Sequence, residues 1–187
     1  MRLSEEEAHH YYTLMWGLQF FVNQELGIHA GVPNELAYAH LSQDEKLPVR
    51  DGLYEHPELI DRFIEENPLD WPKEELAIVA SWKNFVAGDF YIERMLKKHT
   101  IFVGNGQVYA VLGILDSFDE FFYKSELPVL VRTVLLPFQG RIIYDGLLQP
   151  FSLFFGPGIS GDLKETYLAA KQNRRIIARL DGEADVE

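Results

Sequence analysis

The sequence predicts an α+β fold with a helical N-terminal half, a mostly antiparallel β-sheet of about five or six strands over about residues 89–155, and a C-terminal helix. Apolar residues recur with helical spacing in the first half, and this period changes to alternation beyond Gly88. Two dipeptides that favour hairpin turns follow, Asn105-Gly106 and Gln139-Gly140. A block of helices followed by a block of strands is typical of α+β folds.

The 187 residues are expected to form a single domain, with a helical part over 1–87 and a β-meander plus C-terminal helix over 88–187. Ser4 and Glu7 have the spacing of a capping box, which predicts a helix from about residue 5 to 25 that ends at Gly27. Three further helices are predicted: about 35–42, one with His56 as its N-cap and Pro57 at its first position that stops before Asn67-Pro68, and one from Pro72 to about residue 86.

Two hairpins organise the predicted sheet. A turn at Asn105-Gly106 would pair Val103 with Val108, and a turn at Gln139-Gly140 would place Leu136 opposite Ile143. The second hairpin is apolar on both faces, so we expect it to be central and covered on both sides. The predicted strands are 90–96, 100–103, the segment after Gly106, 129–138, 141–148 and 151–155, and the final helix is predicted to begin near Asp162.

Composition and charge exclude several classes of protein. The chain has no cysteine, which excludes disulfides, thiolate nucleophiles and cysteine-bound metals, and it fits a cytoplasmic protein. Acidic residues occupy the place of a signal peptide's apolar segment, and no apolar run is long enough to cross a membrane. Residues 1–80 hold 16 acidic and 5 basic side chains, whereas residues 81–187 hold 13 and 12. This charge disfavours nucleic acid as a partner; the acidic half serves either solubility or a basic partner.

One group of residues is a candidate catalytic or ligand-binding site. In the predicted register Arg132 lies diagonally across from Asp145 on one face of the second hairpin, with Arg141 and Tyr144 nearby. Charged groups on a covered sheet need partners, so an ion pair that satisfies itself is one interpretation. The other is an arginine–carboxylate site that binds a polar or anionic ligand.

Two weaker motifs suggest a cofactor or a metal. Gly156, Gly158 and Gly161 match the G-x-G-x-x-G pattern that cradles phosphates. However, Asp162 places a negative charge at the expected phosphate position, and too few residues follow for a βαβ unit, so we expect no cofactor. His9 and His10, each four residues after a glutamate, could supply metal ligands from one helix face or form surface ion pairs, and we expect no metal.

Several segments carry a family resemblance: residues 47–51, 56–60, 81–83, 97–102 and, most specifically, 135–148 with the pattern LPFxGxIIYDGLL. Over about residues 47–177 the chain resembles a group of uncharacterised bacterial proteins with no established activity. The resemblance implies a stand-alone bacterial domain and assigns no site residues.

The first helix is apolar around most of its circumference, with Tyr12, Trp16 and Phe20 among its aromatic residues. A helix of this kind is buried on more than one side, under its own fold or against a second copy. No catalytic motif is evident, which leans against an enzyme. We therefore expect a non-catalytic cytoplasmic module that binds a protein partner or itself through this helix. The alternative is a ligand-binding protein or hydrolase that uses the Arg132–Asp145 group.

Overall fold

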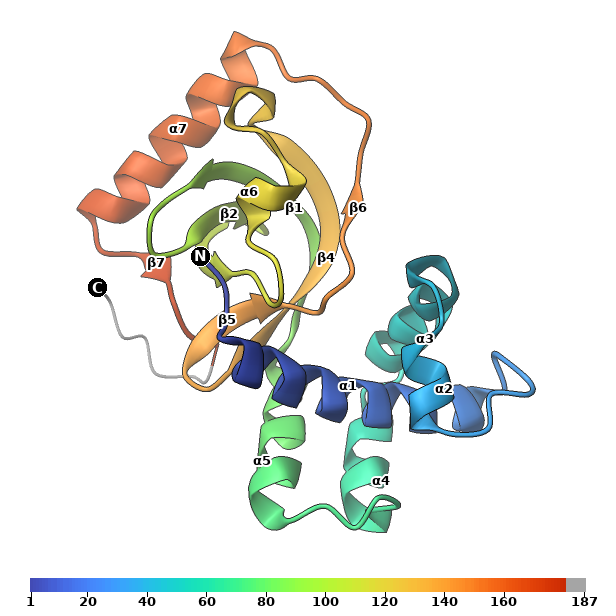
Figure 1. The fold of residues 1–187 in the computed structure, drawn as a ribbon. Coiled ribbons are helices and arrows are strands. Elements are labelled where there is room, and N and C mark those ends of the chain that lie inside the picture. The colour runs from blue at the N-terminus through green and yellow to red at the C-terminus, as the bar shows by residue number, and fades with distance from the viewer. Residues whose placement is uncertain (181–187) are drawn as a thin grey trace. The chain divides into compact units, whose positions relative to one another are not determined.

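The computed structural model describes residues 1–180, which form two compact units (Figure 1). One unit is helical and comprises residues 6–83, whereas the other is built on a β-barrel and comprises residues 1–5 together with the chain from Asn84 onward. The change from helix to strand lies close to Gly88, where the sequence pattern changes, and this confirms the α+β class.

The helical unit contains five α-helices and a 3₁₀ turn among its described residues. They are α1 (Glu5–Leu26), α2 (Glu35–Ala39), α3 (Gln43–Glu55), α4 (Glu58–Glu66), α5 (Lys73–Ser81) and η1 (Trp82–Asn84). Gly27 has a φ of +63°, which confirms the left-handed end predicted for the first helix. Helix α3 was not predicted, because Pro48 lies inside it and proline usually interrupts a helix. Ser42 and Glu45 nevertheless form a capping box at its start.

Aromatic rings pack the interior of the helical unit. The Phe63 ring lies 5.4 Å from the Phe21 ring and 5.1 Å from the Trp71 ring, centroid to centroid. Gly17 on α1 makes room for Trp71, since a Cβ at Gly17 would lie 2.7 Å from the indole ring. Tyr11 and Trp82 meet edge to face at 5.6 Å. The apolar first helix is therefore buried largely as a core element.

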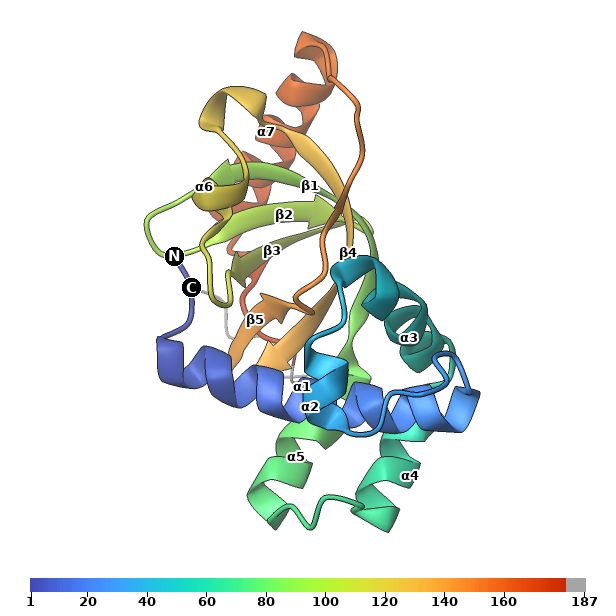
Figure 2. The ribbon, with the colours of Figure 1, turned by 45° about the vertical axis from the view of Figure 1, so that its right-hand side comes forward.

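The second unit contains a closed five-stranded barrel (Figure 2). Its strands are β1 (Val86–Met95), β2 (Thr100–Gly104), β3 (Gln107–Leu112), β4 (Val129–Phe138) and β5 (Arg141–Tyr144). They pair in the order β1-β2-β3-β5-β4, and β4 pairs back onto β1. β1 closes the barrel because its first seven residues pair with β4 and four of its last five pair with β2, with a bulge between Ile92 and Arg94. The mostly antiparallel sheet is confirmed, but the closure and the parallel β3–β5 pair were not predicted.

Both predicted hairpin turns are confirmed. Asn105 and Gly106 have φ values of 53° and 73°, and Gln139 and Gly140 have φ values of 50° and 72°, as two-residue turns of this type require. The predicted pairs Val103–Val108 and Leu136–Ile143 are both formed.

Three predictions for the chain from the end of β5 onward are wrong. β5 ends at Tyr144 instead of Leu148, because the chain turns at Gly146, whose φ is +90°. The predicted strand over residues 151–155 does not form; β6 is only Gln149–Pro150, and a loop follows. The last helix, α7 (Pro157–Gln172), begins five residues before Asp162, with proline at its first position.

Helix α7 covers the outer face of β1–β3. Leu163 and Tyr167 pack against Ile101, Val103 and Val108. After the helix, β7 (Ile176–Ile177) adds to β3 as a parallel strand. Two short helical segments, α6 (Phe118–Phe121) and η2 (Lys124–Glu126), lie between β3 and β4. Buried aromatic side chains fill the barrel: Phe90, Phe102, Tyr109, Phe118 and Tyr144.

Across residues 1–180, none of the helices combines the length and the hydropathy that crossing a bilayer would require.

Candidate functional site

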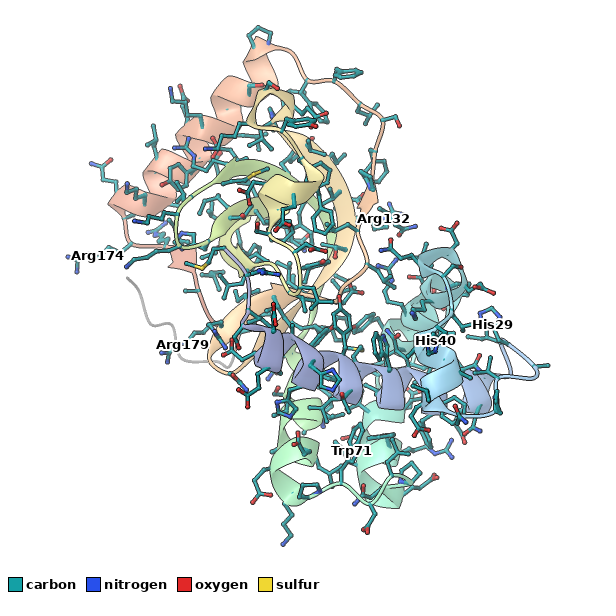
Figure 3. The ribbon with its side chains drawn as sticks, viewed as in Figure 1. His29, His40, Trp71, Arg132, Arg174 and Arg179 are labelled. Carbon is teal, nitrogen blue, oxygen red and sulfur yellow. The ribbon has the colours of Figure 1, made fainter. Side chains whose placement is uncertain are left out.

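Arg132 lies at the barrel surface and binds Asp89 instead of the predicted Asp145. Its Nε and Nη2 atoms donate to the two carboxylate oxygens of Asp89 at 2.7 and 3.1 Å. This interaction holds the pKa of Asp89 below its ordinary value. The Arg132 side chain is 57% exposed, and its guanidinium lies 5.5 Å from the ring of Phe151 (Figure 3). The expected diagonal pair is wrong because barrel closure places β1 beside β4, with Asp89 directly opposite Arg132.

Asp145 is only 2% exposed and fixes the turn after β5. Its Oδ1 atom accepts a hydrogen bond of 3.1 Å from the backbone N–H of Leu147. The hydroxyl of Thr133 lies 3.2 Å from the same oxygen and 2.9 Å from the carbonyl oxygen of Leu147. These contacts are typical of an aspartate that stabilises a tight turn. Asp145 thus has a structural role at this position.

Tyr144 and Arg141 lie in two further environments. The Tyr144 ring points into the barrel, 5.4 Å from the ring of Phe118. Arg141 donates to the side-chain oxygen of Gln139 at 3.1 Å, at the hairpin tip. Arg132 is at the surface, while Tyr144 and Asp145 are buried. The four predicted residues therefore do not line one solvent-facing site.

The glycine pattern near α7 does not form a phosphate-binding loop. Gly156 is the N-cap of α7, and Gly158 and Gly161 lie inside the helix. A Cβ at any of the three would meet no atom within 4 Å, so no close backbone approach requires glycine there. The pattern lies at the start of α7 and within it because Pro157 begins the helix before the second glycine.

His9 and His10 separate on the first helix. His10 Nε2 lies 2.5 Å from a carboxylate oxygen of Glu75 on α5, whereas His9 is exposed. A histidine and a glutamate supply only part of a zinc coordination shell. In the described part of the chain, no three potential ligands gather closely enough to hold a metal ion.

Two other histidines hold loops of the helical unit in place (Figure 3). His29 Nε2 lies 2.7 Å from the carbonyl oxygen of Glu45, and His40 Nδ1 lies 2.7 Å from that of Leu36. Since a carbonyl only accepts, each of these ring nitrogens carries the proton. Both contacts stabilise the backbone and position no reactive group.

The outer face of β2 and β3 is the part of the barrel against which α7 packs. Here α7 covers much of this face with Leu163 and Tyr167. Fold alone does not assign a function. A ligand could therefore reach only the part of this face that α7 leaves open.

An open pocket of about 310 Å³ lies between the second half of α7 and the β2–β3 turn. Arg175 is the one charged residue in its lining, and the sequence analysis did not single it out. The lining comprises Gly106, Gln107, Val108, Thr166, Ala169, Ala170, Asn173 and Arg175. No sequence motif marked this pocket, because it depends on how α7 docks onto the barrel.

A second feature missed from the sequence is an exposed apolar loop. Phe154 is fully exposed and Leu153 is 54% exposed. The segment is fixed at both ends: Phe151 N–H donates to the carbonyl of Leu130 at 2.9 Å, and the Phe155 ring packs 5.2 Å from Tyr91. The barrel therefore presents two adjacent apolar side chains to solvent. We call residues 151–155 the apolar loop.

Comparisons of the chain with family models, with curated proteins and with solved structures find no match. The resemblance to uncharacterised bacterial proteins therefore stays a prediction. The pocket and the apolar loop are the two features of the described residues that suggest a function.

Proposed function

We propose that this protein is a non-catalytic module that self-associates, and that the apolar loop of the barrel unit is the contact surface. The observation that carries the proposal is the full exposure of Phe154 beside the exposed Leu153, on a loop anchored at both ends. Adjacent exposed apolar side chains on a fixed loop are typical of interaction sites.

The first helix is a weaker candidate for the contact than the sequence suggested. Phe20 is buried, and Tyr12 and Trp16 are half-buried and stacked with ring centroids 5.0 Å apart. The ammonium of Lys46 lies 5.4 Å from the Trp16 ring. These contacts already use the aromatic faces that self-association through the helix would need.

The apolar side chains that a dimer would bury are few, which supports weak self-association. Burying a Leu or Phe side chain contributes about 1.5–3 kcal/mol, so two copies of Leu153 and Phe154 would contribute about 6–12 kcal/mol. Lost translational and rotational freedom costs about 4–15 kcal/mol. The two ranges overlap, so we expect a weak dimer that forms only at high protein concentration.

The charge distribution supports contact through the barrel unit. The residues of the barrel unit, 1–5 and 84–187, hold 14 acidic and 12 basic side chains, whereas residues 6–83 hold 15 acidic and 5 basic. Two copies would therefore repel each other chiefly through their helical units. Added salt screens this repulsion, so association should strengthen as ionic strength rises.

Sedimentation velocity over a wide concentration range tests the proposal. The wild type should show a sedimentation coefficient that rises with concentration, and the double variant L153S/F154S should remain monomeric. L168S is the matched control, because Leu168 is also exposed but lies on α7. A wild type that is monomeric throughout, or a dimer that L153S/F154S leaves intact, would contradict the proposal.

We further propose a cytoplasmic location, supported by the absence of cysteine. Fractionation of cells that express the tagged chain tests this; recovery outside the cytoplasm would contradict it.

A further inference from the structure

We propose that the pocket between α7 and the β2–β3 turn binds a small organic anion through the guanidinium of Arg175. This binding site lies wholly within the barrel unit and is independent of self-association. The chemical class is a short molecule with a carboxylate or phosphate group and a few carbon atoms.

The size and lining of the pocket define this class. A volume of about 310 Å³ lies at the small end of the range for ligand sites, which suits a short dicarboxylate or a small phosphate ester and is too small for a dinucleotide. Val108, Ala169 and Ala170 form an apolar wall for the carbon part. Polar groups line the remainder, with Gln107 and Arg175 as side-chain donors.

The local charge favours an anion. Arg175 is the one charged lining residue, and no carboxylate within residues 1–180 forms an ion pair with it. Residues 166–180 contain four basic side chains and no acidic one, and four acidic residues follow in the sequence of residues 181–187. A guanidinium without a carboxylate partner can bind an oxyanion with two parallel hydrogen bonds.

The negative end of the α7 dipole would oppose an anion if its carbonyls were open. They are occupied. The carbonyl of Ala169 accepts from the backbone and side-chain N–H groups of Asn173, at 3.0 and 2.9 Å. The carbonyl of Ala170 accepts from Arg175 N–H at 2.8 Å.

The backbone around Arg175 is fixed on both sides. Arg174 adopts a φ of +53°, a left-handed conformation that glycine would adopt more easily, and completes a Schellman end to the helix. Ile176 then pairs with Val108 on β3. Arg174 points outward from this turn (Figure 3). The backbone at Arg175 is thus held beside the pocket by the helix end and by the sheet.

Amide chemical-shift titration of the ¹⁵N-labelled full chain tests the proposal, with inorganic phosphate and succinate as separate probes at constant ionic strength. We expect saturable shifts at Gly106, Gln107 and Asn173. R175Q should weaken binding about tenfold or more, because a charged hydrogen bond is lost. R132Q is the matched control, since Arg132 is an exposed arginine on the same unit outside the pocket.

The outcomes separate clearly. Tighter binding of phosphate indicates a phosphate ester as the natural ligand, and tighter binding of succinate indicates a dicarboxylate. The proposal is overturned if neither probe gives saturable shifts, if R175Q binds as the wild type does, or if R132Q weakens binding as much as R175Q. L153S/F154S should bind both probes normally, so failure of the self-association proposal would leave this result unchanged.

Discussion

Replacement of Gly104 by alanine should destabilise the barrel unit, although alanine is the better strand residue. An ideal Cβ at Gly104 would lie 2.5 Å from Phe90 Cδ1 and 2.8 Å from the carbonyl oxygen of Asp89. Phe90 is fully buried, and its ring packs 6.2 Å from Phe102 and 5.8 Å from Tyr109. Neither the ring nor the β1 backbone has free space to move into.

The expected magnitude follows from two opposing effects. Removing the backbone freedom of glycine stabilises the folded chain by about 0.5–1 kcal/mol. Overpacking a closed core costs about 1–3 kcal/mol. The clash with Phe90 and Asp89 should therefore win, so we expect G104A to lower the free energy of unfolding of the barrel unit by about 1–2 kcal/mol.

The assay has to report on the barrel unit alone. The three tryptophans, Trp16, Trp71 and Trp82, all lie in the helical unit, so fluorescence does not follow the barrel. Hydrogen exchange of the β2 and β3 amides in urea measures the barrel directly. G158A is the control: its Cβ would meet no atom within 4 Å on α7, so it should be neutral or stabilising. A G104A variant at least as stable as the wild type would refute the reasoning.

Three further variants test individual contacts. R132M should raise the pKa of Asp89 toward its ordinary value in an NMR titration. Because Arg132 lowers the pKa of Asp89 in the folded chain, the ion pair stabilises the barrel unit by at most about 1 kcal/mol above about pH 4. The stability difference between R132M and the wild type should vanish in stronger acid, where Asp89 is protonated. T133V should destabilise the barrel by about 1–3 kcal/mol in hydrogen exchange, since the buried carbonyl of Leu147 loses its donor. K46M should destabilise the helical unit by about 1–3 kcal/mol in fluorescence-detected unfolding, because Lys46 donates to the carbonyls of Ala39 and Leu41 at the end of α2. An unshifted Asp89 pKa, or unchanged stability for either other variant, would contradict these assignments.

Local signals in the sequence were sufficient for most elements of the fold. Asn105-Gly106 and Gln139-Gly140 fix their turns through short-range backbone geometry, so the hairpin registers followed directly. Pro48 hid α3 because proline usually interrupts a helix, and the capping box from Ser42 was the signal that could have identified it.

The candidate site was harder to predict because it depends on contacts between distant segments. Arg132 meets Asp89, 43 residues earlier, only because the barrel closes. The pocket at Arg175 forms only because α7 docks beside the β2–β3 turn. Phe154 could not be identified as exposed from sequence, since an aromatic residue in an apolar segment is usually part of the core. Each of these features requires the tertiary structure.

The most direct test of the proposed contact surface is an NMR dilution series of the wild-type chain, in which amide shifts are followed residue by residue. Self-association through the apolar loop predicts concentration-dependent shifts at Leu153 and Phe154, with none at Tyr12 or Trp16 on the first helix. Shifts confined to the first helix, or spectra that do not change with concentration, would contradict it.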